Sequence, residues 1–212
     1  MARYFPVCLS VAGRKCLVVG GGEVARRKAA SLVAAGAAVT AVSLELCPEL
    51  SRLERVHLLR RPFEDRDVAG MSLVFAATND PELNTRVAKV AREHGALVNV
   101  VDVPAECDFI VPSTLVRGDL TVSVSTGSAA PALARRLRLE LEEQFPQSYA
   151  DFVAVLGELR ALVIREVGDA GRRQAIFRQL ADKATWELFT RDGADAVRRL
   201  VRRLVPSPSG RG

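Results

Sequence analysis

The chain has 212 residues, of which 49% are hydrophobic and 26% charged, a composition that excludes a wholly disordered protein and indicates one full domain with a smaller addition. Its net charge is +5, and all of its 30 basic residues except four lysines are arginine, which suits an acidic partner or substrate but also follows from a GC-rich coding bias. No apolar run is long enough to span a membrane, and the first residues lack the apolar segment of a secretory signal, so we expect a cytoplasmic protein.

The first half of the chain alternates predicted strands and helices. Strands are expected at residues 14–19, 38–43, 56–59, 72–76 and 97–101. Helices are expected at 23–35, ended by Gly36, and at 80–94, begun by Asp80 as the N-cap ahead of Pro81. This alternation predicts a doubly wound α/β domain with a parallel sheet over residues 1–112.

The second half follows a different pattern. Two strands around Arg117-Gly118-Asp119 predict a β-hairpin, which must pack on a helix, another sheet or a second copy of the chain because two strands alone are marginal. Helices are expected at residues 131–144, 148–167, 171–189 and 193–205. The predicted organisation is therefore a hairpin with its helix at 113–145, a helical domain at 146–205 and a disordered tail at 206–212.

A glycine loop joins the first predicted strand to the first helix. Gly20-x-Gly22-x-x-Ala25 in this position is the Rossmann-type fingerprint of dinucleotide binding, with the diphosphate on the amino end of the helix. The predicted cofactor contacts are Gly20, Gly21, Gly22, Glu23, Val24 and Ala25. A tight turn that binds nothing is the alternative.

The end of the second predicted strand bears on the choice of nucleotide. The usual acidic residue for the ribose is absent at Val42-Ser43, but Glu45 follows two residues later, and Leu44 and Glu45 are the candidates. No arginine stands beside Ser43 in sequence to receive a 2′-phosphate, which favours NAD over NADP. Glu45 equally suits a solvated loop.

Two further segments end at the same predicted edge of the sheet. Asp102 directly follows the fifth strand and suits a general base or a group that orients a substrate N–H. Its alternative role is to cap a turn ahead of Pro104. Thr78 and Asn79 are expected to shape the nucleotide cleft rather than to react.

Five segments in order resemble one known family. They are 17–28 around the glycine loop, Phe75-Ala-Ala-Thr-Asn-Asp80, Asn99-Val-Val-Asp102, Asp108-Phe-Ile-Val-Pro-Ser113, and Ser125-Thr-Gly127 with Pro131-Ala-Leu-Ala-Arg135. Over residues 4–145 the chain resembles the bifunctional precorrin-2 dehydrogenase / sirohydrochlorin ferrochelatase family of sirohaem synthesis. The resemblance implies NAD-dependent oxidation of precorrin-2 to sirohydrochlorin, insertion of ferrous iron in some members, and a homodimer formed through the hairpin region.

The resemblance also assigns roles to residues. It places the family's central carboxylate on Asp102 and its tetrapyrrole-contacting loop on Ser125, Thr126 and Gly127. Arg135, just after this loop, is a candidate for binding the carboxylates of the substrate, with a solvated helix face as the alternative. The loop departs from its relatives in reading Gly127-Ser128-Ala129-Ala130-Pro131.

Two other classes of function are alternatives to the dehydrogenase. An NAD-responsive regulator would use the arginine pairs at 198–199 and 202–203 to bind DNA, but such a stripe is typical of the wet face of an amphipathic helix, and we expect no nucleic-acid partner. A chelatase without dehydrogenase activity would have no need of the glycine loop. Four scattered cysteines without a C-x-x-C pair predict neither a zinc site nor a disulfide framework.

Overall fold

The computed structural model describes residues 4–205, which form two compact units. Within the described residues, the first unit comprises 4–111 together with 127–129, and the second comprises 112–126 and 130–205. The tail expected at 206–212 lies outside the described residues.

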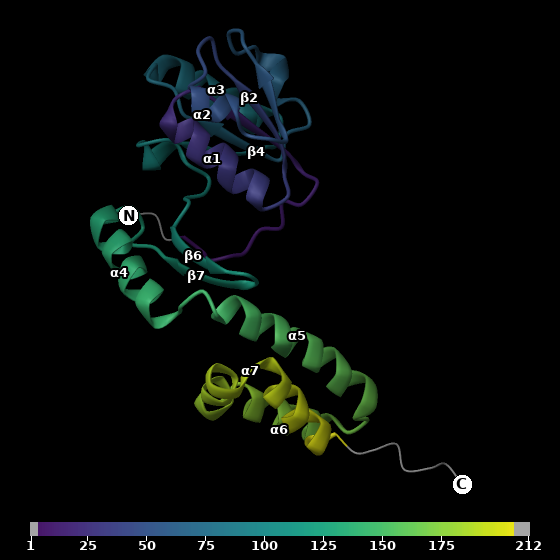
Figure 1. Ribbon diagram of the computed structural model, residues 1–212. Coiled ribbons are helices and arrows are strands. Elements are labelled where there is room, and N and C mark those ends of the chain that lie inside the picture. The colour runs from purple at the N-terminus through teal and green to yellow at the C-terminus, as the bar shows by residue number, and fades with distance from the viewer. Residues whose placement is uncertain (1–3, 206–212) are drawn as a thin grey trace. The chain divides into compact units, whose positions relative to one another are not determined.

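The first unit is built on a five-stranded parallel sheet (Figure 1). Its strands are β1 (Lys15–Val19), β2 (Ala38–Val42), β3 (Val56–Leu59), β4 (Leu73–Ala76) and β5 (Leu97–Val100), in the spatial order β3-β2-β1-β4-β5. The chain leaves β1 toward β2 on one side and later returns to its other side with β4. Such a switch point creates a crevice outside the carboxyl ends of the strands. The structure confirms the doubly wound α/β class.

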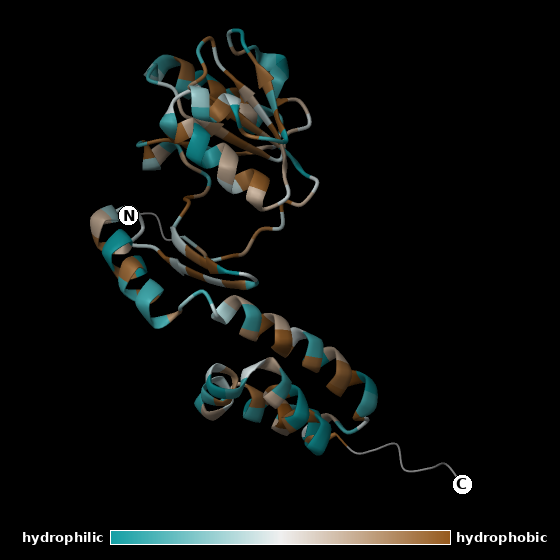
Figure 2. Ribbon diagram, viewed as in Figure 1, coloured by the Kyte–Doolittle hydropathy of each residue, from teal (hydrophilic) through white to brown (hydrophobic). Residues whose placement is uncertain are grey.

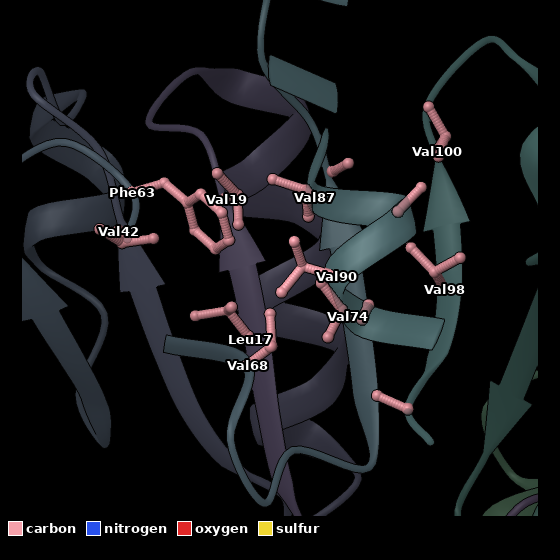
Figure 3. Close-up of a cluster of buried hydrophobic side chains, with 14 residues drawn as sticks. Leu17, Val19, Val42, Phe63, Val68, Val74, Val87, Val90, Val98 and Val100 are labelled. Carbon is pink, nitrogen blue, oxygen red and sulfur yellow. The ribbon is translucent and has the colours of Figure 1, made fainter. Parts of the chain in front are cut away.

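Two helices cover opposite faces of this sheet. Helix α3 (Pro81–Glu93) packs on one face, where the cluster in Figure 3 lies. The labelled members of that cluster are Leu17, Val19, Val42, Phe63, Val68, Val74, Val87, Val90, Val98 and Val100. Helix α1 (Glu23–Ala34) packs on the other face through Ala25, Ala29 and Leu32. Because alternate residues of each central strand supply the two faces, the strands read as continuous apolar runs.

Three short elements were not expected. They are α2 (Pro48–Ser51), η1 (Asp65–Val68) and η2 (Pro104–Glu106). Each has four residues or fewer, which is too short for a hydrophobic period to show in the sequence.

The second unit begins with the antiparallel hairpin of β6 (Ser113–Arg117) and β7 (Leu120–Val124). Helix α4 (Pro131–Gln144) packs on both strands, and Leu115 is buried beneath it. The guanidinium of Arg117 donates a hydrogen bond of 2.9 Å to the carbonyl oxygen of Phe145, just past the end of α4. A helix thus provides the packing surface that a two-stranded ribbon needs.

The remaining helices are α5 (Tyr149–Glu166), α6 (Ala170–Leu180) and α7 (Lys183–Leu204). They share one apolar core, and Figure 2 shows hydrophobic and hydrophilic residues alternating around them. The break expected near residue 190 is confirmed, because α7 consists of two helical pieces that meet at Gly193, where φ of 75° and ψ of −179° are not helical. A second break, after Leu180 and inside the helix expected at 171–189, was not predicted. The cause is tertiary packing, because the early start of α7 stacks Trp186 on Tyr149 with ring centroids 4.0 Å apart.

None of the helices within residues 4–205 combines the length and hydropathy needed to cross a bilayer.

Candidate functional site

The turn between β1 and α1 is tightly packed on one side and open on the other. A Cβ at Gly20, where φ is +130°, would overlap the carbonyl oxygen of Ala77, and a Cβ at Gly21 would overlap that of Glu45. The turn therefore lies directly against the segments that follow β4 and β2, as only glycine allows. At Gly22, by contrast, nothing lies within 4 Å of the position that a Cβ would take.

The amino end of α1 keeps its backbone N–H groups uncapped. Gly22 is the N-cap, and no side chain caps the first turn. The neighbouring α3 differs, because the carboxylate of Asp80 accepts hydrogen bonds from Glu82 N at 2.9 Å and Leu83 N at 3.1 Å. Free N–H groups together with the helix dipole bind anions. Of these two helix ends at the carboxyl edge of the sheet, α1 is the one available to a diphosphate.

The acidic side chain at this helix end is neutralised locally. Glu23 forms a two-pronged ion pair with Arg26, with both N–O distances at 2.6 Å. The hydrogen bond from Arg26 holds the pKa of Glu23 below its usual value. Ala25, two residues further along, is fully buried against the sheet, and Val24 is half-buried. The small residue at position 25 thus allows the close helix–strand contact expected of it.

The segment after β2 flanks the glycine turn. Its backbone is tied to the turn by a 2.8 Å hydrogen bond from Cys47 N to the carbonyl oxygen of Gly21. The side chains of Leu44 and Glu45 are both exposed here, Leu44 to 70%. An exposed apolar side chain beside the turn suits contact with a flat aromatic ring such as adenine.

Sequence reasoning missed Arg60 at the same edge. Ser43 N donates a 3.1 Å hydrogen bond to the carbonyl oxygen of Leu59, which places the end of β3 beside the end of β2. Arg60, exposed, is the next residue. No arginine is adjacent to Ser43 in the sequence, but the strand order brings Arg60 to the same edge from 17 residues away.

Thr78 and Asn79 follow β4 and have different surroundings. The Thr78 hydroxyl donates to Asn84 Oδ1 at 2.8 Å, and the backbone N–H and C=O of Thr78 bond the same buried amide group. Thr78 therefore fixes the loop to α3, while Asn79 is exposed.

Asp102 stands on a tight turn at the end of β5. The turn is closed by a 3.3 Å bond from Val103 N to the carbonyl oxygen of Val100, and Asp102 has a φ of +62°. Its carboxylate accepts no hydrogen bond from residues 4–205, so within that range it does not cap the turn. The turn is held from behind by Cys107, whose sulfur bonds both Val100 N at 3.3 Å and Val100 O at 3.1 Å. Burial raises the pKa of this thiol.

Asn99 attaches the segment that follows this turn to β5. Its buried amide donates a 2.9 Å hydrogen bond to the carbonyl oxygen of Phe109, and Phe109 packs edge-to-face on Phe75 with centroids 5.4 Å apart. Asn99 thus stabilises the fold around Asp102 by joining β5 to the segment at Phe109.

The predicted substrate-binding residues lie after β7 and on α4. Thr126 Oγ1 accepts a 3.1 Å hydrogen bond from Ala130 N, which shapes the loop that also contains Ser125 and Gly127. On α4, Arg136 pairs with Glu140 at 2.7 Å and Arg138 pairs with Glu142. Arg135 is exposed, and in the part of the chain that the structure describes it has no acidic partner.

The first unit matches a known protein family. The family described as "Putative NAD(P)-binding" matches residues 7–113, half of the chain, and this range includes the whole parallel sheet. The chain belongs to this family. NAD(P) binding agrees with the uncapped amino end of α1 and the open space at Gly22.

Longer proteins match more of the chain. "Siroheme synthase" of Thioalkalivibrio sulfidiphilus is 41% identical over 205 residues, which are 95% of this chain and 42% of that protein. "Siroheme synthase" of Methylobacillus flagellatus is 38% identical over 210 residues, 98% of this chain and 44% of that protein. The chain thus spans less than half the length of these relatives. The family resemblance indicated by the sequence segments is confirmed.

A solved structure supports the fold. "SirC, precorrin-2 dehydrogenase" superposes with a TM-score of 0.78 and 24% identity, covering 94% of this chain and all of that one. The order of a parallel sheet, a hairpin and C-terminal helices is therefore shared with a known protein.

Proposed function

We propose that the chain catalyses the NAD-dependent oxidation of precorrin-2 to sirohydrochlorin in sirohaem synthesis. The observation that carries the proposal is the uncapped amino end of α1 on the sheet edge that also bears the unpaired carboxylate of Asp102. A site for hydride transfer needs a binding site for the diphosphate of the cofactor and a nearby group that accepts a proton, and both lie on this edge. The names of the relatives supply the substrate.

Cofactor binding falls to the residues of the first unit. Backbone N–H groups of residues 22–25 would hold the diphosphate, while Leu44 and Glu45 would lie against the adenosine part. Thr78 and Asn79 would line the opposite side of the crevice. When bound, NAD supplies the acceptor for the hydride that leaves the macrocycle.

Asp102 has the role of proton acceptor in this proposal. Oxidation of the reduced macrocycle releases a proton for each hydride removed, and an ionised carboxylate can take that proton. Asp102 lies on the tight turn that follows β5, and within residues 4–205 no hydrogen bond holds its carboxylate. The carboxylate is thus free to meet a substrate N–H or C–H group.

Substrate carboxylates need basic partners. We assign Ser125, Thr126, Gly127 and Arg135 to the tetrapyrrole, because the loop matches the family's substrate loop. Arg135 also differs from its neighbours Arg136 and Arg138 in having no carboxylate of the described chain paired with it. Ferrous iron would be a substrate of the chelatase reaction, which is measured in an assay of its own.

The proposal includes a homodimer in the cytoplasm. Val116 on the hairpin and Leu133 and Leu139 on α4 are exposed apolar side chains that a second copy would cover. The four cysteines, Cys8, Cys16, Cys47 and Cys107, are free thiols, as is usual in a reducing compartment.

The experiment is an anaerobic assay of the purified chain with precorrin-2 and NAD, in which NADH and sirohydrochlorin are followed together. We expect both to form in equal amounts and the rate to be lower with NADP. Arms with sirohydrochlorin and Fe²⁺ measure chelation by itself. If no NADH forms while NAD binds, the proposed dehydrogenase activity is wrong.

A further inference from the structure

Lys28 is a half-buried lysine that the proposed mechanism does not use. It belongs to α1, six residues after the N-cap Gly22, and its Nζ lies 5.7 Å from the centroid of the Phe75 ring. The chain has only four lysines, and the side chains of Lys89 and Lys183 are 76% and 87% exposed. Lys28 therefore differs from these two lysines in being partly covered by the protein.

Helix geometry directs Lys28 toward the edge that bears Asp102. Side chains of an α-helix lean toward its amino end, and the amino end of α1 lies at the carboxyl edge of the sheet. Phe75 of β4 is paired in register with Asn99 of β5, three residues before Asp102. The ammonium group thus lies over the β4–β5 side of the edge rather than over β2.

The charges around Lys28 fall into two groups. Burial lowers the pKa of its amine, and the positive charge of Arg27 on the same helix acts in the same direction. Cys107 and Asp102, on the segment that follows β5, act in the opposite direction. Phe75, packed beneath the amine, carries no charge. Among the groups acting on Lys28, Asp102 is the carboxylate.

We propose that Lys28 is a positioning residue whose ammonium group holds the carboxylate of Asp102 at the cofactor edge when substrate covers the site. Asp102 is exposed in the structure, so water screens the attraction between the two side chains. A macrocycle lying over the edge would exclude that water, and the attraction would strengthen because the local dielectric constant falls. This inference rests on the proposed function, since the positioned carboxylate is the proposed proton acceptor.

The alternative is that Lys28 only covers the Phe75 ring, since a lysine stem packs readily on apolar surface while its amine remains wet. In that case the charge of Asp102 has no influence on the amine. The two possibilities differ in a titration that does not depend on turnover.

The first test titrates the lysines of the full-length chain after reductive ¹³C-methylation, which keeps their charge. The four lysines and the terminal α-amine give five signals, of which those of Lys89 and Lys183 serve as internal controls. We expect Asp102→Asn to move the titration of Lys28 to lower pH and to leave the two control signals unchanged. An unmoved Lys28 signal overturns the inference whether or not the chain oxidises precorrin-2.

The second test compares Lys28→Met and Lys28→Arg in the precorrin-2 assay, with Lys89→Met as the control. We expect Lys28→Met to lower kcat at least tenfold with the Kd for NAD and the Tm close to wild type. Lys28→Arg should restore kcat to within about threefold, because the charge returns. Equal loss in Met and Arg variants, or no loss in either, contradicts a positioning role. A wild-type chain without dehydrogenase activity overturns the proposed function, while the titration still decides the pairing.

Discussion

Asp102 is a site residue with an unusual backbone conformation. Its positive φ belongs to the left-handed region, which costs most L-residues about 1–2 kcal/mol and which asparagine and aspartate tolerate best. The turn would form more easily with glycine at this position. The backbone conformation at residue 102 therefore favours glycine, yet the chain has an aspartate there. Such backbone strain is common at functional positions.

Substitutions at Asp102 should separate chemistry from folding. We expect Asp102→Asn to lower kcat for precorrin-2 oxidation at least 100-fold with the Kd for NAD within about twofold, because only the charge is lost. Asp102→Gly should be equally inactive, while its free energy of unfolding equals or exceeds that of wild type by up to about 1 kcal/mol. Steady-state kinetics and urea unfolding check these outcomes. Wild-type turnover in either variant would remove Asp102 from the mechanism.

The glycines at positions 21 and 22 make a matched pair for cofactor binding. Gly22→Asp should abolish NAD binding through bulk and charge, with no loss of Tm, because Gly22 has an ordinary φ of −85° and open space around it. Gly21→Ala should lower Tm, because its Cβ would overlap the carbonyl oxygen of Glu45. Calorimetric titration and thermal unfolding measure the two effects. Retained NAD binding in Gly22→Asp would refute the proposed cleft.

At the scale of elements, the five strands and the helices α1, α3 and α4 could be predicted from the sequence. Their apolar runs and periods come directly from burial, and the Asp80 cap and the Gly36 stop are local signals. The break between α6 and α7 could not be predicted, because the stacking of Trp186 on Tyr149 depends on a distant helix. For the same reason Lys28 and Arg60 were missed: strand order and helix packing, not sequence spacing, bring them to the site.

Asp67 of the short element η1 should make the free energy of unfolding fall at low pH. Burial raises the pKa of Asp67, but hydrogen bonds from Arg61 (2.6 Å) and Glu64 N (2.9 Å) outweigh it, so the net pKa is lowered. A carboxylate with a lowered folded pKa contributes stability that is fully present above its unfolded pKa of about 3.9 and is lost as the pH falls through the folded value.

We therefore expect Asp67→Asn to cost about 1 kcal/mol of unfolding free energy between pH 5 and pH 7. The difference from wild type should shrink steadily below about pH 4. Urea unfolding at a series of pH values measures it. A difference that stays constant down to pH 2 would show that the charge of Asp67 is not involved.

At the scale of the whole molecule, the two units carry different parts of the proposed chemistry. The first contains the family's NAD(P)-binding sheet, and the second contains the hairpin whose outer side chain Val116 is 55% exposed. In the proposed homodimer, a second copy of the chain would cover this valine together with the exposed Leu133 and Leu139 of α4.

A charge on the hairpin should therefore separate the subunits. We expect wild type to behave as a dimer in light scattering and Val116→Asp to behave as a monomer or to weaken association at least tenfold. Ile164→Asp on α5 is the matched control, because Ile164 is 50% exposed but lies outside the hairpin and α4. Dissociation by both variants alike, or by neither, would contradict an interface at the hairpin.

The positive φ of Asp102 has a consequence for laboratory evolution. A library screened only for survival after heating would gain from glycine at residue 102 and would be indifferent to the lost carboxylate. Such a screen should therefore enrich robust but inactive clones at this one codon, and a thermostabilised version of the chain would need residue 102 kept out of the mutagenesis.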